Sequence, residues 1–149
     1  IHLSSDRPWA IDRLGQLRIK QGAYLWRDLL NAGVVVASGT DSPVEPVDPI
    51  ANFYAAVTRK TLKGIPETGF EPTQKLSRME ALHAMTLAAA YAAFEDQHKG
   101  SIEVGKLADL TVLNQDLTTV PETEILNTDV LLTIVGGEVV YQRDEITIP

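Results

Sequence analysis

The sequence contains no cysteine and has no excess of positive charge. Without cysteine, a disulfide framework, a thiol nucleophile and a zinc site built from thiolates are all excluded. There are 13 Lys and Arg residues against 20 Asp and Glu residues, and the net charge of -7 disfavours a nucleic-acid partner, which needs a basic patch. No apolar stretch approaches the length that crosses a bilayer, so no membrane partner is expected.

The first residues also lack a signal-peptide pattern, because Ile1, His2 and Leu3 are followed at once by polar residues. We therefore expect a cytoplasmic location. The chain does not begin with Met, and we interpret it as a segment of a longer protein. Its 149 residues, of which 44% are hydrophobic, are enough to build a core.

The most informative segment that is present is the apolar run that ends in Asp41. Residues 34–37 are Val-Val-Val-Ala, which is typical of a strand buried on both faces. Ser38 and Gly39 let the backbone leave that strand, and Asp41 follows just beyond its carboxyl end. In α/β folds this edge carries the chemistry. By itself the segment is equally compatible with an ordinary turn in which Asp41 accepts a hydrogen bond from a neighbouring amide.

Helix signals surround this segment. Apolar positions at helical spacing predict a helix over residues 23–31, and the strand at 34–37 follows it as in the αβ step of a parallel sheet. Asp48 before Pro49 is typical of a helix start, with Asp48 as N-cap, and the helix should run to about Lys60.

Further along the chain, a second helix start has two marks. Ser77 and Glu80 have the spacing of a capping box, and the alanine-rich helix that they begin should continue to about Phe94. Near the N-terminus, residues 4–8 are rich in turn formers and predict a loop.

The C-terminal residues predict β structure instead. Residues 108–113 alternate as in a strand, and the runs 130–135 and 138–141 flank a Gly-Gly turn, which is a strong hairpin signal. Because the pattern changes near Lys99, we place a domain boundary there. The two predicted domains are residues 1–98 and residues 99–149.

Four motifs in this order carry a resemblance to a known family. They are the strand and Gly-Thr-Asp-Ser-Pro turn at 34–45, the Asp-Pro helix start with Tyr-Ala-Ala-Val-Thr-Arg at 48–59, the Gly-Ser-Ile-Glu-Val-Gly-Lys-Leu-Ala-Asp-Leu stretch at 100–110, and the hairpin at 134–141. Together they resemble the amidohydrolase superfamily, in particular the predicted metal-dependent hydrolases related to N-substituted formamide deformylase. The resemblance covers nearly the whole chain.

This resemblance implies a fold of class α/β. Residues 1–98 would be the last βα units of a (β/α)₈ TIM barrel, which is incomplete here, and residues 99–149 would be the C-terminal strands of a small, composite β-sandwich domain. The family's enzymes are metal-dependent hydrolases, so the implied activity is hydrolysis of an amide-like C–N bond of a small-molecule substrate through a metal-activated water.

The resemblance also assigns the site residues. Asp41 matches the aspartate after the eighth strand, which binds a divalent metal and helps to move the proton of a metal-bound water. One or two ions, zinc in our interpretation, are implied for the full-length enzyme. Zn²⁺ lowers the pKa of bound water to about 7, and a carboxylate beside that water can accept its proton.

The three histidines are interpreted differently. His2 resembles the histidine at the end of the family's seventh strand, where it would face the pocket and contact substrate; the alternative is a frayed terminal residue with no role. His83 and His98 are interpreted as structural or exposed residues. Arg59 is expected at a helix end, where the helix dipole and a local salt bridge explain it.

The sequence lacks most of the ligands that the resemblance implies, because it contains no His-x-His pair. The rest of the site would lie in the remainder of the same polypeptide. We therefore expect the 149 residues alone to bind the metal weakly or not at all and to be inactive. The alternative function is a non-catalytic C-terminal module for folding, assembly or binding. Homo-oligomerisation and the substrate are left open.

Overall fold

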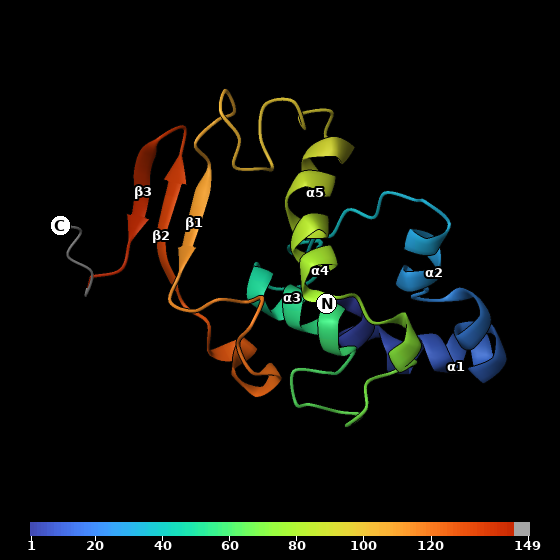
Figure 1. The fold of residues 1–149 in the computed structure, drawn as a ribbon. Coiled ribbons are helices and arrows are strands. Elements are labelled where there is room, and N and C mark those ends of the chain that lie inside the picture. Colours follow the sequence, from blue (N-terminus) through green and yellow to red (C-terminus); the bar gives the residue numbers. More distant parts are fainter. Residues whose placement is uncertain (145–149) are drawn as a thin grey trace.

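The computed structural model describes residues 1–144 and places a bundle of short helices beside a small sheet (Figure 1). The sheet stands to one side of the helices and is built from the last part of the chain. In chain order the elements are α1 (His2–Gly22), α2 (Trp26–Asn31), α3 (Pro49–Thr58), η1 (Pro72–Gln74), α4 (Arg78–Met85), α5 (Leu87–Ala92), β1 (Leu110–Leu113), η2 (Glu122–Asn127), β2 (Val130–Val135) and β3 (Glu138–Gln142).

Helix α3 lies at the centre of the helical part and begins as the sequence predicts. The carboxylate of Asp48 accepts hydrogen bonds from the backbone N–H groups of Ile50 at 2.9 Å and Ala51 at 3.0 Å. Pro49 occupies the first turn, where a missing N–H costs nothing. Nearly every residue from Ile50 to Thr58 is buried, so α3 is the core of the helical part.

Two hydrophobic clusters hold the elements together. The larger one surrounds α3 and includes Leu117 and Ile125 from the C-terminal part of the chain. The smaller one joins Leu3 of α1 to Phe70. Trp26 at the start of α2 packs against both clusters, and α2 is therefore fixed to each of them.

The predicted capping box is confirmed, whereas the long helix after it is not. The Ser77 hydroxyl accepts from the Glu80 N–H, and the Ser77 N–H donates to the Glu80 carboxylate at 2.7 Å. The helix expected to reach Phe94 is interrupted at Thr86, whose backbone is not helical (φ -118°, ψ -91°). The Thr86 hydroxyl donates to the Leu82 carbonyl at 2.7 Å, so local bonding satisfies the break between α4 and α5.

Two expectations for the N-terminal segment are wrong. Residues 4–8, which were predicted as a loop, lie in α1. His2, which the resemblance placed at the end of a strand, is the first residue of the same helix. Gly15 interrupts α1 with φ 74° and ψ 159°. The helix predicted over 23–31 begins only at Trp26, because Tyr24 before it has a left-handed backbone with φ 58°.

The strand predicted at residues 34–37 is also wrong for this chain. The segment has no regular secondary structure, and Val34 and Val35 are 46% and 49% exposed. A strand needs at least one neighbouring strand to pair with, and the described residues place all their strands in the C-terminal sheet. The TIM barrel therefore stays a prediction, and so does the domain boundary near Lys99.

The predicted hairpin is confirmed. Strand β2 pairs antiparallel with β1 on one side and β3 on the other, which gives the chain a mixed α/β structure with a three-stranded antiparallel sheet. Val135 faces Glu138 across the turn. Gly136 and Gly137 have φ of 58° and 88°, the left-handed conformations that a tight turn between twisted strands requires.

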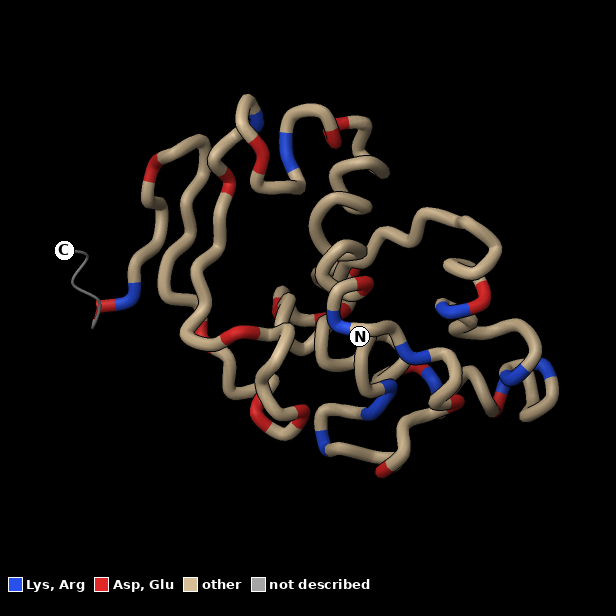
Figure 2. The backbone as a smooth tube through the Cα atoms, in the orientation of Figure 1, with Lys and Arg blue, Asp and Glu red and all other residues tan. Residues whose placement is uncertain are grey.

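Acidic and basic residues are interspersed along the chain, but several stretches, including residues 29–40, 49–58 and 81–94, carry no charged side chain (Figure 2). Acidic residues exceed basic ones by 20 to 13, without a continuous stretch of either sign along the trace. None of the helices in residues 1–144 combines the length and the apolar character needed to cross a membrane.

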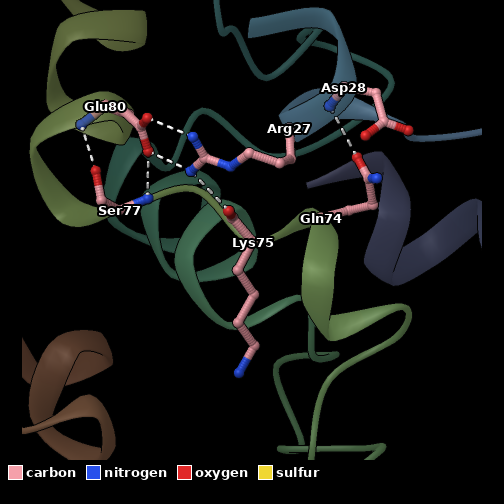
Figure 3. A network of polar contacts seen from close by, with 6 residues as sticks. All are labelled: Arg27, Asp28, Gln74, Lys75, Ser77 and Glu80. Atoms are coloured by element: carbon pink, nitrogen blue, oxygen red, sulfur yellow. Dashed lines mark hydrogen bonds and ion pairs between the residues drawn. The ribbon is translucent and has the colours of Figure 1, made fainter. Parts of the chain in front are cut away.

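A polar network joins α2 to α4 (Figure 3). The Arg27 guanidinium donates to both carboxylate oxygens of Glu80, in one case at 2.5 Å, and to the Lys75 carbonyl at 3.0 Å. Beside it, the Asp28 N–H donates to the Gln74 side chain at 3.2 Å. The hydrogen bonds from Arg27 lower the pKa of Glu80 from 4.5 to about 2. Glu80 thus serves the cap of α4 and the contact with α2 together.

We predict that replacing Glu80 by Gln destabilises the fold in a pH-dependent manner. Because the pKa of Glu80 is lower in the folded chain, its ionised form stabilises the fold above pH 4.5, and this contribution is lost as the pH falls toward 2. The side chain is 35% exposed and therefore screened, so we expect about 1 kcal/mol near neutral pH. Urea unfolding at several pH values from neutral to acidic measures the difference in the free energy of unfolding between wild type and Glu80→Gln. Glu67→Gln, at an exposed position, is the control. If the free energy of unfolding differs between wild type and Glu80→Gln by the same amount at every pH, the prediction is contradicted.

We also predict that Gly69 tolerates no side chain. It has φ 83°, and a Cβ atom would lie 2.2 Å from the backbone oxygen of Thr58. Gly69→Ala should lower the free energy of unfolding by about 2 kcal/mol or more, because strain and overlap add. Gly22→Ala is the matched control, since no atom lies within 4 Å of its Cβ position. Equal urea midpoints for the two variants would contradict the prediction, because the Thr58 backbone would then move aside without a cost in free energy.

Candidate functional site

Asp41 is held at the end of a segment that is tied down at two points. The Ser38 N–H donates to the Ala84 carbonyl of α4 at 2.9 Å, and the Asn52 side-chain amide donates to the Ser38 hydroxyl at 2.9 Å. Asp41 itself has a left-handed backbone, with φ 57°, and its carbonyl accepts from the Val44 N–H at 2.9 Å. Asp tolerates this conformation better than most residues, so the turn presents its carboxylate outward.

The structure brings the two predicted site residues together. The Nε2 atom of His2 lies 3.4 Å from the Oδ2 atom of Asp41. The imidazole is 30% exposed, whereas the carboxylate is 71% exposed. His2 reaches this position from the first turn of α1 rather than from a strand end. The juxtaposition agrees with a shared role for the two residues, although their individual roles stay predictions.

Hydrogen bonds fix the start of α1 beside this pair. The Ser4 hydroxyl donates to the Lys60 carbonyl at 2.7 Å, just after α3. The Ser5 hydroxyl donates to the carboxylate of Glu45, which lies in the proline-rich loop after Asp41. Glu45 is half-buried and thus joins that loop to α1 at the edge of the site.

A cavity of about 200 Å³ adjoins the pair on the side of His2. His2, Gly39 and Asn52 line it together with the aromatic side chains of Tyr24 and Trp26. The cavity combines an imidazole, a buried amide and an aromatic wall. Such a mixture of apolar surface and a few polar groups is typical of small-molecule sites.

Asn52 is a site residue that the sequence reasoning missed. It is only 4% exposed, and besides its bond to Ser38 its Oδ1 atom accepts from the Ile1 amine at 2.8 Å. The available signal was a single amide in an otherwise apolar helix face. A buried amide is costly unless it is bonded, so Asn52 fixes the two segments that carry Asp41 and His2.

Arg59 lies at the end of α3, as expected, but the expected local salt bridge is wrong. The side chain is only 1% exposed and forms no ion pair among the described residues. Burial lowers the pKa of Arg59 to about 10, against the opposing effect of Glu71, so the guanidinium stays protonated at neutral pH. Nothing local in the sequence signals this burial, because the groups around it come from distant segments.

His2 and Asp41 are of the residue types that bind metal ions, but two side chains are too few for a complete site. An imidazole nitrogen and a carboxylate oxygen are both zinc ligands, and catalytic zinc sites use three protein ligands. Within the described part of the chain, no group of three or more His, Asp or Glu side chains is arranged to hold an ion. His83 and His98 are exposed, as expected, and lie outside the pair. His2 and Asp41 can thus supply only part of a metal site.

Comparison with known proteins identifies the family. The model of the amidohydrolase family matches residues 1–141, and the chain belongs to this family. It is 33% identical to the putative amidohydrolase YtcJ of Bacillus subtilis (strain 168) over 95% of the chain and 26% of that relative. It is also 36% identical to the N-substituted formamide deformylase of Arthrobacter pascens, over 78% of the chain and 21% of that relative. The predicted family is confirmed.

Solved structures give the same result. The chain superimposes on an uncharacterized metal-dependent hydrolase from Pyrococcus horikoshii OT3 with a TM-score of 0.68 and 31% identity, covering 82% of this chain and 24% of that one. The chain therefore spans about a quarter of the length of the relatives that it matches.

Proposed function

We propose that the chain is the C-terminal part of a metal-dependent amidohydrolase that hydrolyses an amide-like C–N bond of a small molecule. The observation that carries the proposal is the approach of His2 Nε2 to Asp41 Oδ2 at 3.4 Å, next to a cavity in a chain of this family. The deformylase among its relatives supports the bond type. The substrate itself is not specified by these residues.

In this proposal the two residues have different roles. Asp41 holds a divalent metal, zinc by our interpretation, and accepts the proton of the attacking water on its carboxylate. His2 binds the substrate from the opposite segment through its imidazole. When bound, zinc supplies Lewis-acid chemistry that makes water nucleophilic near neutral pH. The exposure of Asp41 supports its role, because a carboxylate that binds an ion and accepts a proton from water must be accessible.

The same proposal assigns residues 1–98 to the last units of a (β/α)₈ barrel and residues 99–149 to a small β domain. The segment at 34–37 supports this assignment, because its valines are half-exposed and further barrel strands could pair with it. The remaining metal ligands would come from those strands. A cytoplasmic location is part of the same proposal.

We predict that Asp41→Asn in the longer protein lowers turnover by about 100-fold or more, because the amide cannot accept the proton. Asp48→Asn is the matched control: it is a nearby carboxylate, and Asn is an equally good N-cap, so activity should stay. Steady-state hydrolysis of amide substrates, with thermal unfolding as a check of folding, measures the effect. Full activity in a folded Asp41→Asn variant would refute the role of Asp41.

We also predict that the 149 residues alone neither retain stoichiometric zinc nor turn over substrate, because His2 and Asp41 supply too few ligands. Elemental analysis after dialysis and an activity assay with added Zn²⁺ test this prediction. One equivalent of bound zinc together with turnover would mean that this chain contains a complete site. Turnover by the 149 residues without bound zinc would likewise contradict the prediction.

A further inference from the structure

Arg59 is a buried cation without an anionic partner. Among the described residues no carboxylate lies within ion-pair distance of it, and its Nη2 atom is buried without a hydrogen bond. Its Nε atom donates to the Phe70 carbonyl at 2.5 Å, and Nη1 donates to the Tyr24 carbonyl at 2.9 Å. A buried charge in this state is costly, since neutral oxygens replace the water and the counter-ion only in part.

Two aromatic rings also lie against the guanidinium. The guanidinium carbon lies 4.6 Å from the centre of the Trp26 ring and 5.7 Å from that of Phe70. Both distances fall within the roughly 6 Å over which a cation is attracted to the face of a ring. Arg59 therefore links α3 to two rings from different segments, and one of these rings, Trp26, also lines the cavity beside His2.

One of the two carbonyls that Arg59 binds belongs to Tyr24, the other aromatic residue of the cavity wall. Tyr24 has the left-handed backbone that turns the chain from α1 into α2, and its carbonyl accepts from Nη1. The rings of Tyr24 and Trp26 meet edge to face, with centres 6.5 Å apart and planes at 80°. One side chain thus contacts both residues of the aromatic wall, by a hydrogen bond to the first and a ring contact with the second.

The backbone next to Arg59 is bonded to the start of α1, which carries His2. Lys60, the next residue, accepts through its carbonyl the hydrogen bond from Ser4, two positions after His2. The Arg59 carbonyl accepts from the Phe70 N–H at 2.8 Å, which fixes the second ring. The segment that carries His2 and the segment that carries the aromatic wall are therefore both attached at residues 59–60.

We propose that Arg59 is a positioning residue that sets the aromatic wall of Tyr24 and Trp26 against His2. This inference rests on the proposed function, which assigns a small-molecule substrate to the cavity. Arg59 touches neither His2 nor Asp41 by any contact described above, so it acts through Tyr24, Trp26 and the start of α1. An apolar side chain of similar length would fill the same space without a buried charge, and it would leave the Tyr24 carbonyl unbonded and Trp26 without its cation.

The test uses two probes that the chain itself supplies. The chain has two tryptophans, and Trp9 is 67% exposed, so Trp9→Phe leaves Trp26 as the single tryptophan, which can be excited selectively. Acrylamide quenching then reports access to the wall. The imidazole proton resonances of His2, His83 and His98 report three separate places. In this background we compare Arg59→Met, Arg59→Lys and, as the matched control, Arg18→Met on the exposed surface of α1.

In Arg59→Met we expect the quenching constant of Trp26 to rise roughly twofold, because looser packing admits the quencher. The His2 resonance should shift, whereas those of His83 and His98 stay in place. Arg59→Lys, which keeps the charge but lacks the planar fork, should move both signals in the same direction by less. Arg18→Met should change neither signal.

Unchanged Trp26 quenching and an unchanged His2 resonance in a folded Arg59→Met variant would overturn the proposal. Equal shifts of all three histidines, or unfolding of both Arg59 variants, would overturn it too, because Arg59 would then be a residue of general stability. None of these measurements depends on turnover. A failure here is therefore distinguishable from a failure of the proposed hydrolase function, which the Asp41 variant tests.

Discussion

The burial of helix α3 is the constraint on which the rest of the structure depends. Its residues pack into the larger hydrophobic cluster with groups from α4 and from the C-terminal part of the chain. Apolar burial of this kind contributes about 25 cal/mol for each Å² removed from water, so a helix buried along most of its length becomes a fixed reference. Asp48 caps its start, and Arg59 follows its end.

The site is built outward from this helix. Asn52 on α3 bonds to Ser38 in the segment that leads to Asp41, and residues 59–60 hold the aromatic turn and the start of α1. Side chains on loops gain precision when a rigid element supports them. The connections between α1, α2 and the loop of Asp41 contain little regular structure. Each of these three segments is nevertheless attached to α3. The geometry of His2 and Asp41 follows from these attachments.

Buried polar groups carry much of this arrangement, and a group of this kind costs free energy wherever it lacks a partner. Both polar atoms of the Asn52 side chain are hydrogen-bonded, whereas Arg59 keeps one nitrogen without a partner. Apolar residues would form a core at a lower cost in free energy, but they would not hold carbonyls and hydroxyls at fixed positions. We interpret these groups as the means by which an otherwise apolar helix orients the cavity.

The sequence by itself determined the features that depend on neighbouring residues. The Asp48 cap, the capping box of Ser77 and Glu80, and the Gly-Gly hairpin were predicted and are confirmed, because each is a bond or a backbone conformation within a few positions. The family was also predictable, since its motifs are read directly from the order of residues and the family model matches residues 1–141.

Only the tertiary structure decided the features that depend on distant partners. The segment at 34–37 has the pattern of a buried strand, yet it forms none without strands beside it. Arg59 has the position of a surface residue at a helix end, but Tyr24, Trp26 and Phe70 enclose it. The contact of His2 with Asp41 likewise spans two separate segments. Local pattern specifies caps and turns, whereas burial and pairing are set by whatever the rest of the chain brings into contact.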